Sequence, residues 1–331
     1  MTPLTPLNTL KSLVLSSRPL SWVNTAFPFA AAYFMTARHI DVAFIVGTIF
    51  FLIPYNLAMY GINDVFDYES DLRNPRKGGV EGALLDPRVH SITLAAAVLL
   101  NLPFLIFLVM VGTPGSAIVL AVSAFAVFAY SAPRLPLGFG TLPLRFKERP
   151  FLDSLTSSIH FVSPAIFGLT LAGAQPTPAL LALLGAYLLW GIASHAFGAV
   201  QDIIADREAQ IASIATVIGG RRTVRLAFVA YLLAAALLVF TPFPGPLAAL
   251  LMLPYAANVL PYRRITDAHA EAAHAGWRRF LLLNFATGFA VTLLLIWFAL
   301  LTSACAGGNN FGWAAWVPGA MGWVHGHSLC G

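Results

Sequence analysis

Charged residues are scarce in this sequence of 331 residues, of which they make up 10%, against roughly a quarter in an ordinary soluble domain. So few charges cannot cover the surface of a typical soluble enzyme. Intrinsic disorder is also excluded, because disordered chains combine many charges with few apolar residues. Cysteine is scarcer still, since the sequence contains only Cys305 and Cys330. Two cysteines are too few for a disulfide framework or a cysteine zinc site.

Apolar residues are correspondingly abundant in this sequence. They make up 58% of the sequence, and the mean hydropathy is +0.78. The apolar stretches are continuous rather than alternating, which is typical of membrane-spanning helices and not of a membrane barrel. A span needs about 20 residues, and runs of that size fall near residues 20–37, 40–62, 91–111, 115–133, 151–172, 178–200, 223–242, 244–262 and 280–301.

The sequence therefore predicts an all-α integral membrane protein with nine transmembrane helices. These form a single domain over residues 1–301, followed by a tail over 302–331 that is rich in Gly and Trp and carries no charge. The first apolar run is long and follows Arg18 and Pro19, so we expect it to remain in the protein as a span rather than act as a cleaved signal peptide.

The basic residues orient these spans. The chain has 19 Lys and Arg against 14 Asp and Glu. With the N-terminus in the cytoplasm, nine spans place every basic residue except Arg38 on the cytoplasmic side, as the positive-inside rule requires. The basic excess thus predicts topology and gives no support to nucleic-acid binding. We expect a multi-pass protein of the cell membrane with its C-terminus outside the cytoplasm.

The acidic residues are not explained by that rule, yet all but Asp41 fall on the same side, and they cluster. The first cluster is NDVFDYESD at 63–71, directly after the second predicted span. Asn63, Asp67 and Asp71 are spaced by four, which puts them on one face of a helix. Like charges at this spacing repel, and Mg²⁺ would relieve the repulsion, because it prefers oxygen ligands and bridges carboxylates to substrate phosphates.

A second cluster, DIIAD at 202–206, follows the sixth predicted span. Asp202 and Asp206 repeat the spacing of four. An even number of spans separates the two clusters, so both lie on one side of the membrane and can converge on one centre with two Mg²⁺ ions. We predict that Asp67, Asp71, Asp202 and Asp206 are catalytic, and that the metal ligands are Asn63, Asp64, Asp67, Asp71, Asp202 and Asp206.

Basic residues beside these clusters complete the set of groups that hold a diphosphate. We favour Lys77, which follows the first cluster, and Arg134, which lies four residues after Tyr130. Topology alone explains most of the other basic residues. The predicted diphosphate-binding set is Lys77, Arg134, Tyr130, Arg73, Arg18 and Arg207. Two histidines inside predicted spans, His160 and His195, are interpreted as neutral side chains hydrogen-bonded between helices.

These motifs resemble the UbiA superfamily of intramembrane prenyltransferases. The resemblance rests on NDVFDYESD at 63–71, YSAPR at 130–134, LRFKERP at 144–150 and DIIADREAQIASIATVIGG at 202–220, and it runs from about Arg18 to the last span. It implies nine helices around a central cavity, with the motif loops on the cytoplasmic side. It also implies Mg²⁺-dependent transfer of an allylic prenyl group from its diphosphate to a lipophilic acceptor in the bilayer.

The segment NPRKGGVEG at 74–82 departs from the quinone-forming members and is similar to the carotenoid-forming lycopene elongases. This likeness implies dimethylallyl diphosphate as donor and lycopene as acceptor. Ile204 and Gln210 stand where the family usually has Glu and Gly. An aromatic quinone precursor or a tetrapyrrole remains the alternative acceptor, and the need for a partner subunit stays open. A transporter fits less well, because transporters place ionisable residues near the bilayer midplane.

Overall fold

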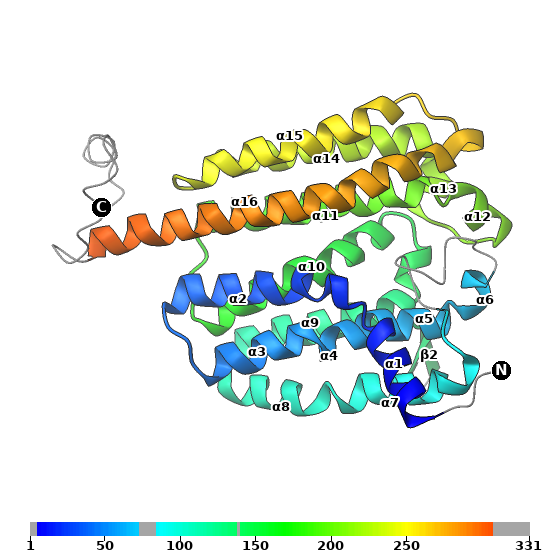
Figure 1. Cartoon of the computed structure of the whole chain (residues 1–331), viewed down its shortest axis with the longest axis horizontal. Coiled ribbons are helices and arrows are strands. Elements are labelled where there is room, and N and C mark those ends of the chain that lie inside the picture. The colour runs from blue at the N-terminus through cyan, green and yellow to red at the C-terminus, as the bar shows by residue number, and fades with distance from the viewer. Residues whose placement is uncertain (1–4, 73–83, 138–139, 307–331) are drawn as a thin grey trace.

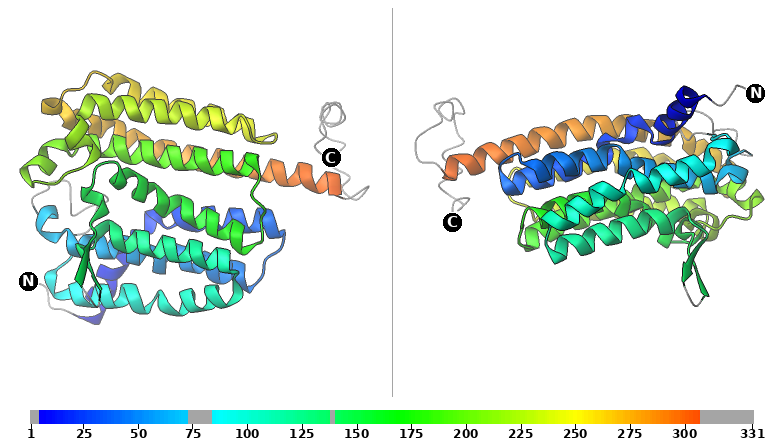
Figure 2. Two further views of the ribbon diagram at one scale, coloured as in Figure 1. Left: turned by 180° about the vertical axis from the view of Figure 1, so that it is seen from behind. Right: turned by 90° about the horizontal axis from the view of Figure 1, so that it is seen from below.

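The computed structural model describes residues 5–72, 84–137 and 140–306. Its long helices lie side by side with their axes along one common direction, so that the turns between them gather at the two ends of the bundle (Figures 1 and 2). The first half of the chain and the helices at the end of the chain form two groups of helices. The helix of residues 152–171 packs against members of both groups.

The first half of the chain is helical up to the first acidic cluster and beyond it. A short π-helical turn, Leu57–Gly61, interrupts the second long helix just before that cluster. Its elements are α1 (Pro6–Ser16), α2 (Val23–Ala37), α3 (Val42–Leu52), α4 (Pro54–Asn56), α5 (Ile62–Phe66), α6 (Tyr68–Asp71), α7 (His90–Leu99), α8 (Leu102–Val111) and α9 (Pro114–Ser131).

A small hairpin separates the two halves. Strands β1 (Arg134–Leu137) and β2 (Gly140–Pro143) pair antiparallel, with Arg134 opposite Pro143. The second half contains α10 (Leu152–Leu171), α11 (Pro178–Val200), α12 (Ile203–Glu208), α13 (Ile214–Ile218), α14 (Gly220–Leu238), α15 (Ala248–Val259) and α16 (His274–Ala306). Short 3₁₀ turns join several of these elements.

Each of the nine predicted spans is occupied by helix in the part of the chain that the structure describes. Six helical stretches are long and apolar enough to cross a membrane: Val42–Phe66, Pro87–Val111, Pro114–Ser131, Leu152–Leu171, Pro178–Val200 and Asp267–Ser303. The helices α2 and α15 are shorter than these stretches, and α14 has three arginines within its first six residues. The count of nine crossings therefore stays a prediction. The last helix continues to Ala306, beyond the predicted boundary at 301, and residues 307–331 lie outside the described residues.

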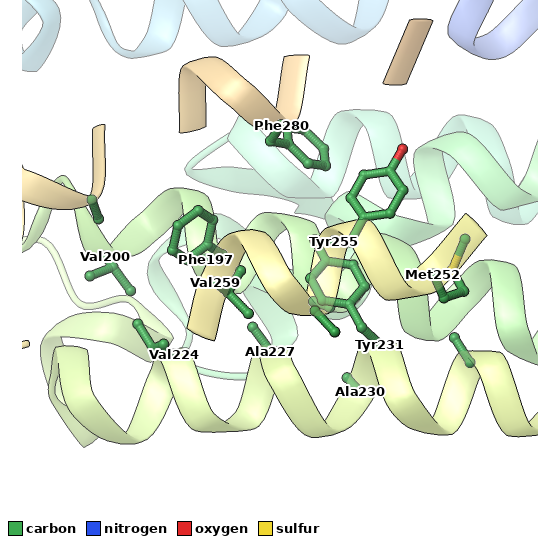
Figure 3. Close-up of a cluster of buried hydrophobic side chains, with 14 of the residues drawn as sticks. Phe197, Val200, Val224, Ala227, Ala230, Tyr231, Met252, Tyr255, Val259 and Phe280 are labelled. Carbon is green, nitrogen blue, oxygen red and sulfur yellow. The ribbon is translucent and has the colours of Figure 1, made fainter. Parts of the chain in front are cut away.

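Two apolar clusters hold the bundle together. One fills the space among α11, α14, α15 and α16, and Figure 3 shows its aromatic members, among them Phe197, Tyr231, Tyr255 and Phe280. The Tyr231 and Tyr255 rings stack with centroids 5.4 Å apart. The other cluster lies among α2, α3, α8, α9 and α10 and contains Phe29, Phe51 and Phe167.

Small residues let the central helix come close to its neighbour. A Cβ at Gly168 of α10 would lie 2.7 Å from the backbone oxygen of Phe29 in α2. This is the close backbone approach that small residues permit between membrane helices. The helix α10 is thereby fixed against the first half of the chain, and its N-terminus lies at the end of the bundle where both acidic clusters are found (Figure 1).

Candidate active site

The first acidic cluster keeps its predicted helical spacing. The backbone N–H of Asp67 donates to the carbonyl of Asn63 at 2.9 Å, and the N–H of Asp71 donates to the carbonyl of Asp67 at 2.8 Å. Asn63, Asp67 and Asp71 therefore follow one another by single helical turns along one face. Asp67 and Asp71 are buried at 5% and 6% exposure. Buried carboxylates need a positive charge or hydrogen-bond donors nearby.

The positive charge that balances Asp64 comes from the N-terminal segment. The Arg18 guanidinium donates to Oδ1 of Asp64 at 2.8 Å, and the Ser16 hydroxyl donates to Oδ2 at 3.0 Å. The guanidinium also lies 4.4 Å from the centroid of the Tyr60 ring. Burial alone would lower the pKa of Arg18, but the Asp64 carboxylate outweighs this effect and raises it. Arg18 is thus held as a cation at the edge of the first cluster.

The positive charges that balance Asp67 come from the loop between α9 and α10. The Lys147 ammonium forms an ion pair with Oδ1 of Asp67, and an Arg145 guanidinium nitrogen lies 3.6 Å from the same oxygen. The loop is anchored by backbone hydrogen bonds from Leu144 to Pro133 at 3.1 Å and from Arg145 to Ala132 at 2.9 Å. The sequence explains Lys147 and Arg145 by membrane topology alone, and their place in the basic loop after Arg134 is the only sequence signal that points to the site.

The second acidic cluster also spans one helical turn, because the N–H of Asp206 donates to the carbonyl of Asp202 at 2.8 Å. Both carboxylates are half-buried. The Ser213 hydroxyl donates to Oδ2 of Asp206 at 3.4 Å. The chain after this cluster passes through Gln210, whose φ of 57° is left-handed. Glycine adopts this conformation at least cost, in keeping with Gly as the usual residue there in the resembling family.

A buried carboxylate that the sequence reasoning passed over fixes this second loop. Asp153, fully buried in the first turn of α10, accepts the N–H of Ile214 at 2.7 Å and that of Ser154 at 2.7 Å. Ile214 is the first residue of α13. The sequence signal that could have identified Asp153 is its position as a single acidic residue at the start of an apolar run, directly after a basic loop. Oδ2 of Asp153 joins the central helix to the chain that follows Asp206, while Oδ1 is held by the adjacent N–H of Ser154.

The first acidic cluster and the chain that follows the second one lie on either side of the loop of residues 145–148. A cavity of about 200 Å³ is bordered by Glu69 and Ser70 of the first cluster, by the basic loop, and by residues 209–211, which follow the second cluster. The carboxylates of Asp153, Asp67 and Asp206 all act electrostatically on the Tyr130 hydroxyl at the end of α9, so residues of both clusters lie on the same side of the molecule as Tyr130. The residues that line the cavity are Phe66, Glu69, Ser70, Arg145, Glu148, Ala209, Gln210 and Ile211.

A second cavity of about 150 Å³ contains both polar and apolar groups. Arg18 and Asn63 form part of its wall, so it reaches the first acidic cluster. The Tyr130 hydroxyl, also in the wall, is 3.1 Å from Nε2 of His195, whose Nδ1 is 3.1 Å from the Ser154 hydroxyl. The complete lining is Arg18, Met59, Tyr60, Asn63, Tyr130, Ser157, His160 and Phe161.

The remaining predicted diphosphate ligands are not gathered here. Arg134 is exposed on the hairpin. Arg207 donates to Asp267 at 2.7 Å and to the carbonyl of Thr216 at 3.0 Å, so its charge serves a contact between the loops. Arg73 and Lys77 lie outside the described residues. Among the predicted set, the structure therefore brings Arg18 and Tyr130 to the cavity beside the first cluster.

The oxygen ligands fit Mg²⁺ when phosphate supplies the rest of its shell. Within the described ranges, no three His, Cys, Asp or Glu side chains are grouped as a complete metal site. Mg²⁺ in phosphate-binding enzymes needs only one or two carboxylates, and substrate phosphates and water complete the octahedron. Asp67 and Asp71 are buried and oxygen-only. Asp67 already holds the positive charge of Lys147, which indicates that its surroundings favour a cation.

Comparisons with known proteins agree with this arrangement. A model described as the UbiA prenyltransferase family matches residues 25–285. A protein of Dietzia sp. (strain CQ4) described as "C(50) beta-cyclic carotenoids biosynthesis protein LbtBC" is 56% identical over 89% of this chain and 66% of its own length. The chain thus spans just under two thirds of that relative. A lycopene elongase/hydratase of Corynebacterium glutamicum is 52% identical over 87% of this chain and 97% of its own length.

Solved structures share the fold. A UbiA homolog from Archaeoglobus fulgidus, bound to DMAPP and Mg²⁺, matches with a TM-score of 0.59 at 16% identity, over 83% of this chain and 98% of that one. A UbiA homolog from Aeropyrum pernix K1 matches with a TM-score of 0.57 at 16% identity, over 82% and 98%. At such identities the likeness concerns the arrangement of the helices alone.

Proposed function

Because this chain belongs to the UbiA prenyltransferase family, we propose that it transfers a five-carbon prenyl group from dimethylallyl diphosphate to an end of lycopene. The reaction depends on Mg²⁺, and the product is a longer carotenoid. The observation that carries the proposal is a cavity bordered by the first acidic cluster, the basic loop and the chain after the second acidic cluster, together with a second cavity whose wall combines charged and polar groups with Met59 and Phe161. This arrangement combines a place for a diphosphate with a place for a hydrocarbon.

The acidic clusters hold the metal. Asn63, Asp67 and Asp71 from the first cluster, and Asp202 and Asp206 from the second, would supply oxygen ligands for two Mg²⁺ ions, whereas Asp64, predicted as a further ligand, pairs with Arg18. When bound, Mg²⁺ neutralises the negative charge that develops on the departing diphosphate.

The basic loop holds the diphosphate. Lys147 and Arg145 balance Asp67 in the structure, and a metal ion at Asp67 would make that positive charge redundant. Lys147 is then free to bind diphosphate oxygens, and Arg145, which also pairs with Glu148, can add a bidentate contact. We propose that they join Arg18, Tyr130 and Lys77 as diphosphate ligands. Arg207 and Arg134 are secondary candidates, since the first is paired elsewhere and the second is exposed.

The acceptor side of the cavity excludes water. Met59, Tyr60 and Phe161 line the second cavity together with Tyr130, and apolar and aromatic walls keep an allylic cation from being captured by water. Aromatic faces also attract a cation. Lycopene is favoured as acceptor because the relatives above are described as carotenoid and lycopene enzymes and share more than half of their aligned residues with this chain.

We further propose that the protein crosses the cell membrane nine times, with its N-terminus and both acidic clusters on the cytoplasmic side. The ends of the bundle differ in charge in the way this orientation requires, since Arg145, Lys147 and Arg207 lie at the end that holds the clusters, whereas Arg38 follows α2 at the other end.

Production of the protein in cells that accumulate lycopene tests the proposal. We expect carotenoids that are longer by one or two five-carbon units, and only lycopene when Asp67→Ala or Asp202→Ala is produced at the same level in the membrane. Unchanged lycopene with the well-produced wild type would contradict the proposal. Prenylation of an added aromatic acceptor by the same membranes would then support the quinone-precursor alternative.

A further inference from the structure

One buried histidine in the second cavity has an unused nitrogen. His160 lies in the middle of α10 and is 3% exposed. The Ala126 backbone in α9 lies close enough to the ring to affect its charge, and among the described residues the ring's Nε2 is buried without a hydrogen-bond partner. In a neutral imidazole one ring nitrogen donates and the other accepts. With Nδ1–H directed to the Ala126 carbonyl, Nε2 carries the lone pair.

The other intramembrane histidine shows the difference. Both ring nitrogens of His195 have partners, the Tyr130 hydroxyl and the Ser154 hydroxyl, as expected for a histidine that serves packing between helices. A buried polar atom without a partner costs free energy. The unpaired Nε2 of His160 thus calls for an explanation that structure alone does not supply.

The position of His160 suggests what it meets. It lines the same cavity as Arg18 and Asn63, which belong to the proposed diphosphate end, and as Phe161, which belongs to the apolar end. Its ring lies edge-on to the Tyr130 ring, with centroids 5.2 Å apart. A hydrocarbon that reacts in this cavity would have its reacting carbon between the diphosphate end and the imidazole.

The proposed reaction needs a proton acceptor at this place. The C–O bond to the diphosphate breaks, the terminal double bond of the acceptor forms a new C–C bond to the allylic carbon, and the positive charge moves to the acceptor. That tertiary cation is discharged when an adjacent C–H bond gives its electron pair to a new C=C bond, or when water adds and loses a proton. Either route releases one proton into an apolar cavity.

We propose that Nε2 of His160 accepts this proton. This inference rests on the proposed function and adds a residue to it. The donor–acceptor pattern fits the task, because Nδ1–H fixes the ring on Ala126 and leaves Nε2 as the base, just as a catalytic imidazole is oriented by its second nitrogen. The protonated ring then passes the proton to the released diphosphate, which is the more basic group and leaves the cavity as hydrogen diphosphate.

The test uses His160→Asn in the full-length protein, reconstituted with lycopene and isotope-labelled dimethylallyl diphosphate. The Asn amide keeps a donor close to the position of Nδ1 and removes Nε2. Released diphosphate and labelled carotenoid are measured in the same reaction. His39→Gln, an exposed histidine at the opposite end of the bundle, is the control.

We expect His160→Asn to release diphosphate at a rate within about threefold of the wild type, because ionisation precedes the proton transfer. Its ratio of labelled carotenoid to diphosphate should fall about 100-fold, the lower end of what a general base contributes, with label appearing in small five-carbon products. Mass spectrometry of the wild-type carotenoid distinguishes the two routes, since water addition leaves a hydroxyl group.

Three results would overturn the inference. An unchanged ratio in His160→Asn would show that Nε2 takes no part. Loss of diphosphate release together with carotenoid would assign His160 to assembly of the site. Absence of labelled carotenoid from the wild type would refute the proposed function, and the role of His160 with it.

Discussion

Asp153 offers a test of the site that does not depend on knowing the substrate. Its two carboxylate oxygens accept the N–H groups of Ser154 and Ile214, both at 2.7 Å, inside the protein. In Asp153→Asn one oxygen remains, and the other position becomes an NH₂ group that faces an N–H donor. The variant therefore loses a hydrogen bond to a charged group, worth about 1.5–3 kcal/mol, and leaves a buried donor without an acceptor, which costs about 1–3 kcal/mol.

The two costs partly overlap as the loop relaxes, so we expect a loss of about 2–5 kcal/mol in the free energy of unfolding. A chain of this size loses roughly 2–4 °C in Tm per kcal/mol, which predicts a fall of about 4–20 °C. Thermal unfolding in detergent measures it. Asp86→Asn is the matched control, because Asp86 pairs with Arg88 at the exposed surface, where an ion pair contributes little.

The same substitution should also affect function. Ile214 follows Ser213, whose hydroxyl donates to Asp206. A looser attachment at Ile214 frees this neighbour, so the Mg²⁺ concentration for half-maximal activity should rise in Asp153→Asn. Equal Tm values for Asp153→Asn and Asp86→Asn would show that the buried carboxylate of Asp153 does not hold the loop.

The remaining predictions concern the charges around the first cluster. Lys147→Met should raise the KM for the allylic diphosphate about 10–100-fold, the loss of one charge-assisted bond, and steady-state kinetics should show Lys147→Arg recovering part of it. Arg18→Met leaves Asp64 buried without its cation and should lower the free energy of unfolding by about 3–5 kcal/mol. The double variant with Asp64→Asn should recover much of that loss in the same denaturation assay, and no recovery would contradict the pairing. Chelation of divalent cations should abolish prenyl transfer while Tm changes little, and restored activity on addition of Mg²⁺ is the check.

Local features of the site could be predicted from the sequence. The spacing of Asn63, Asp67 and Asp71 defines one helical face because a helix repeats every 3.6 residues, and the structure confirms consecutive turns through these residues. The helical ranges could also be predicted, because a long apolar run in a membrane has few alternatives to a helix. The likeness to the UbiA family also held, and it rested on short motifs of this kind.

Pairings between distant segments could not be predicted. Arg18 and Arg207 are both predicted to bind diphosphate, and the sequence did not show that Arg18 also pairs with Asp64, 46 positions away, or Arg207 with Asp267, 60 positions away. Partner choice among several arginines and aspartates depends on how the helices pack, and composition and spacing contain no information on that packing. Lys147 and Asp153 were passed over because each is a single charge whose role appears only when another segment lies against it.

We propose above that this protein joins a five-carbon allylic group to lycopene at a Mg²⁺-dependent site. The most direct test of this proposal is reconstitution of the purified wild-type protein in lipid vesicles with lycopene, labelled dimethylallyl diphosphate and Mg²⁺, followed by mass analysis of the carotenoids. The account predicts label in carotenoids that are longer by one or two five-carbon units, and none when Mg²⁺ is withheld. Label that stays in the diphosphate, or that enters only an added aromatic acceptor, would contradict it.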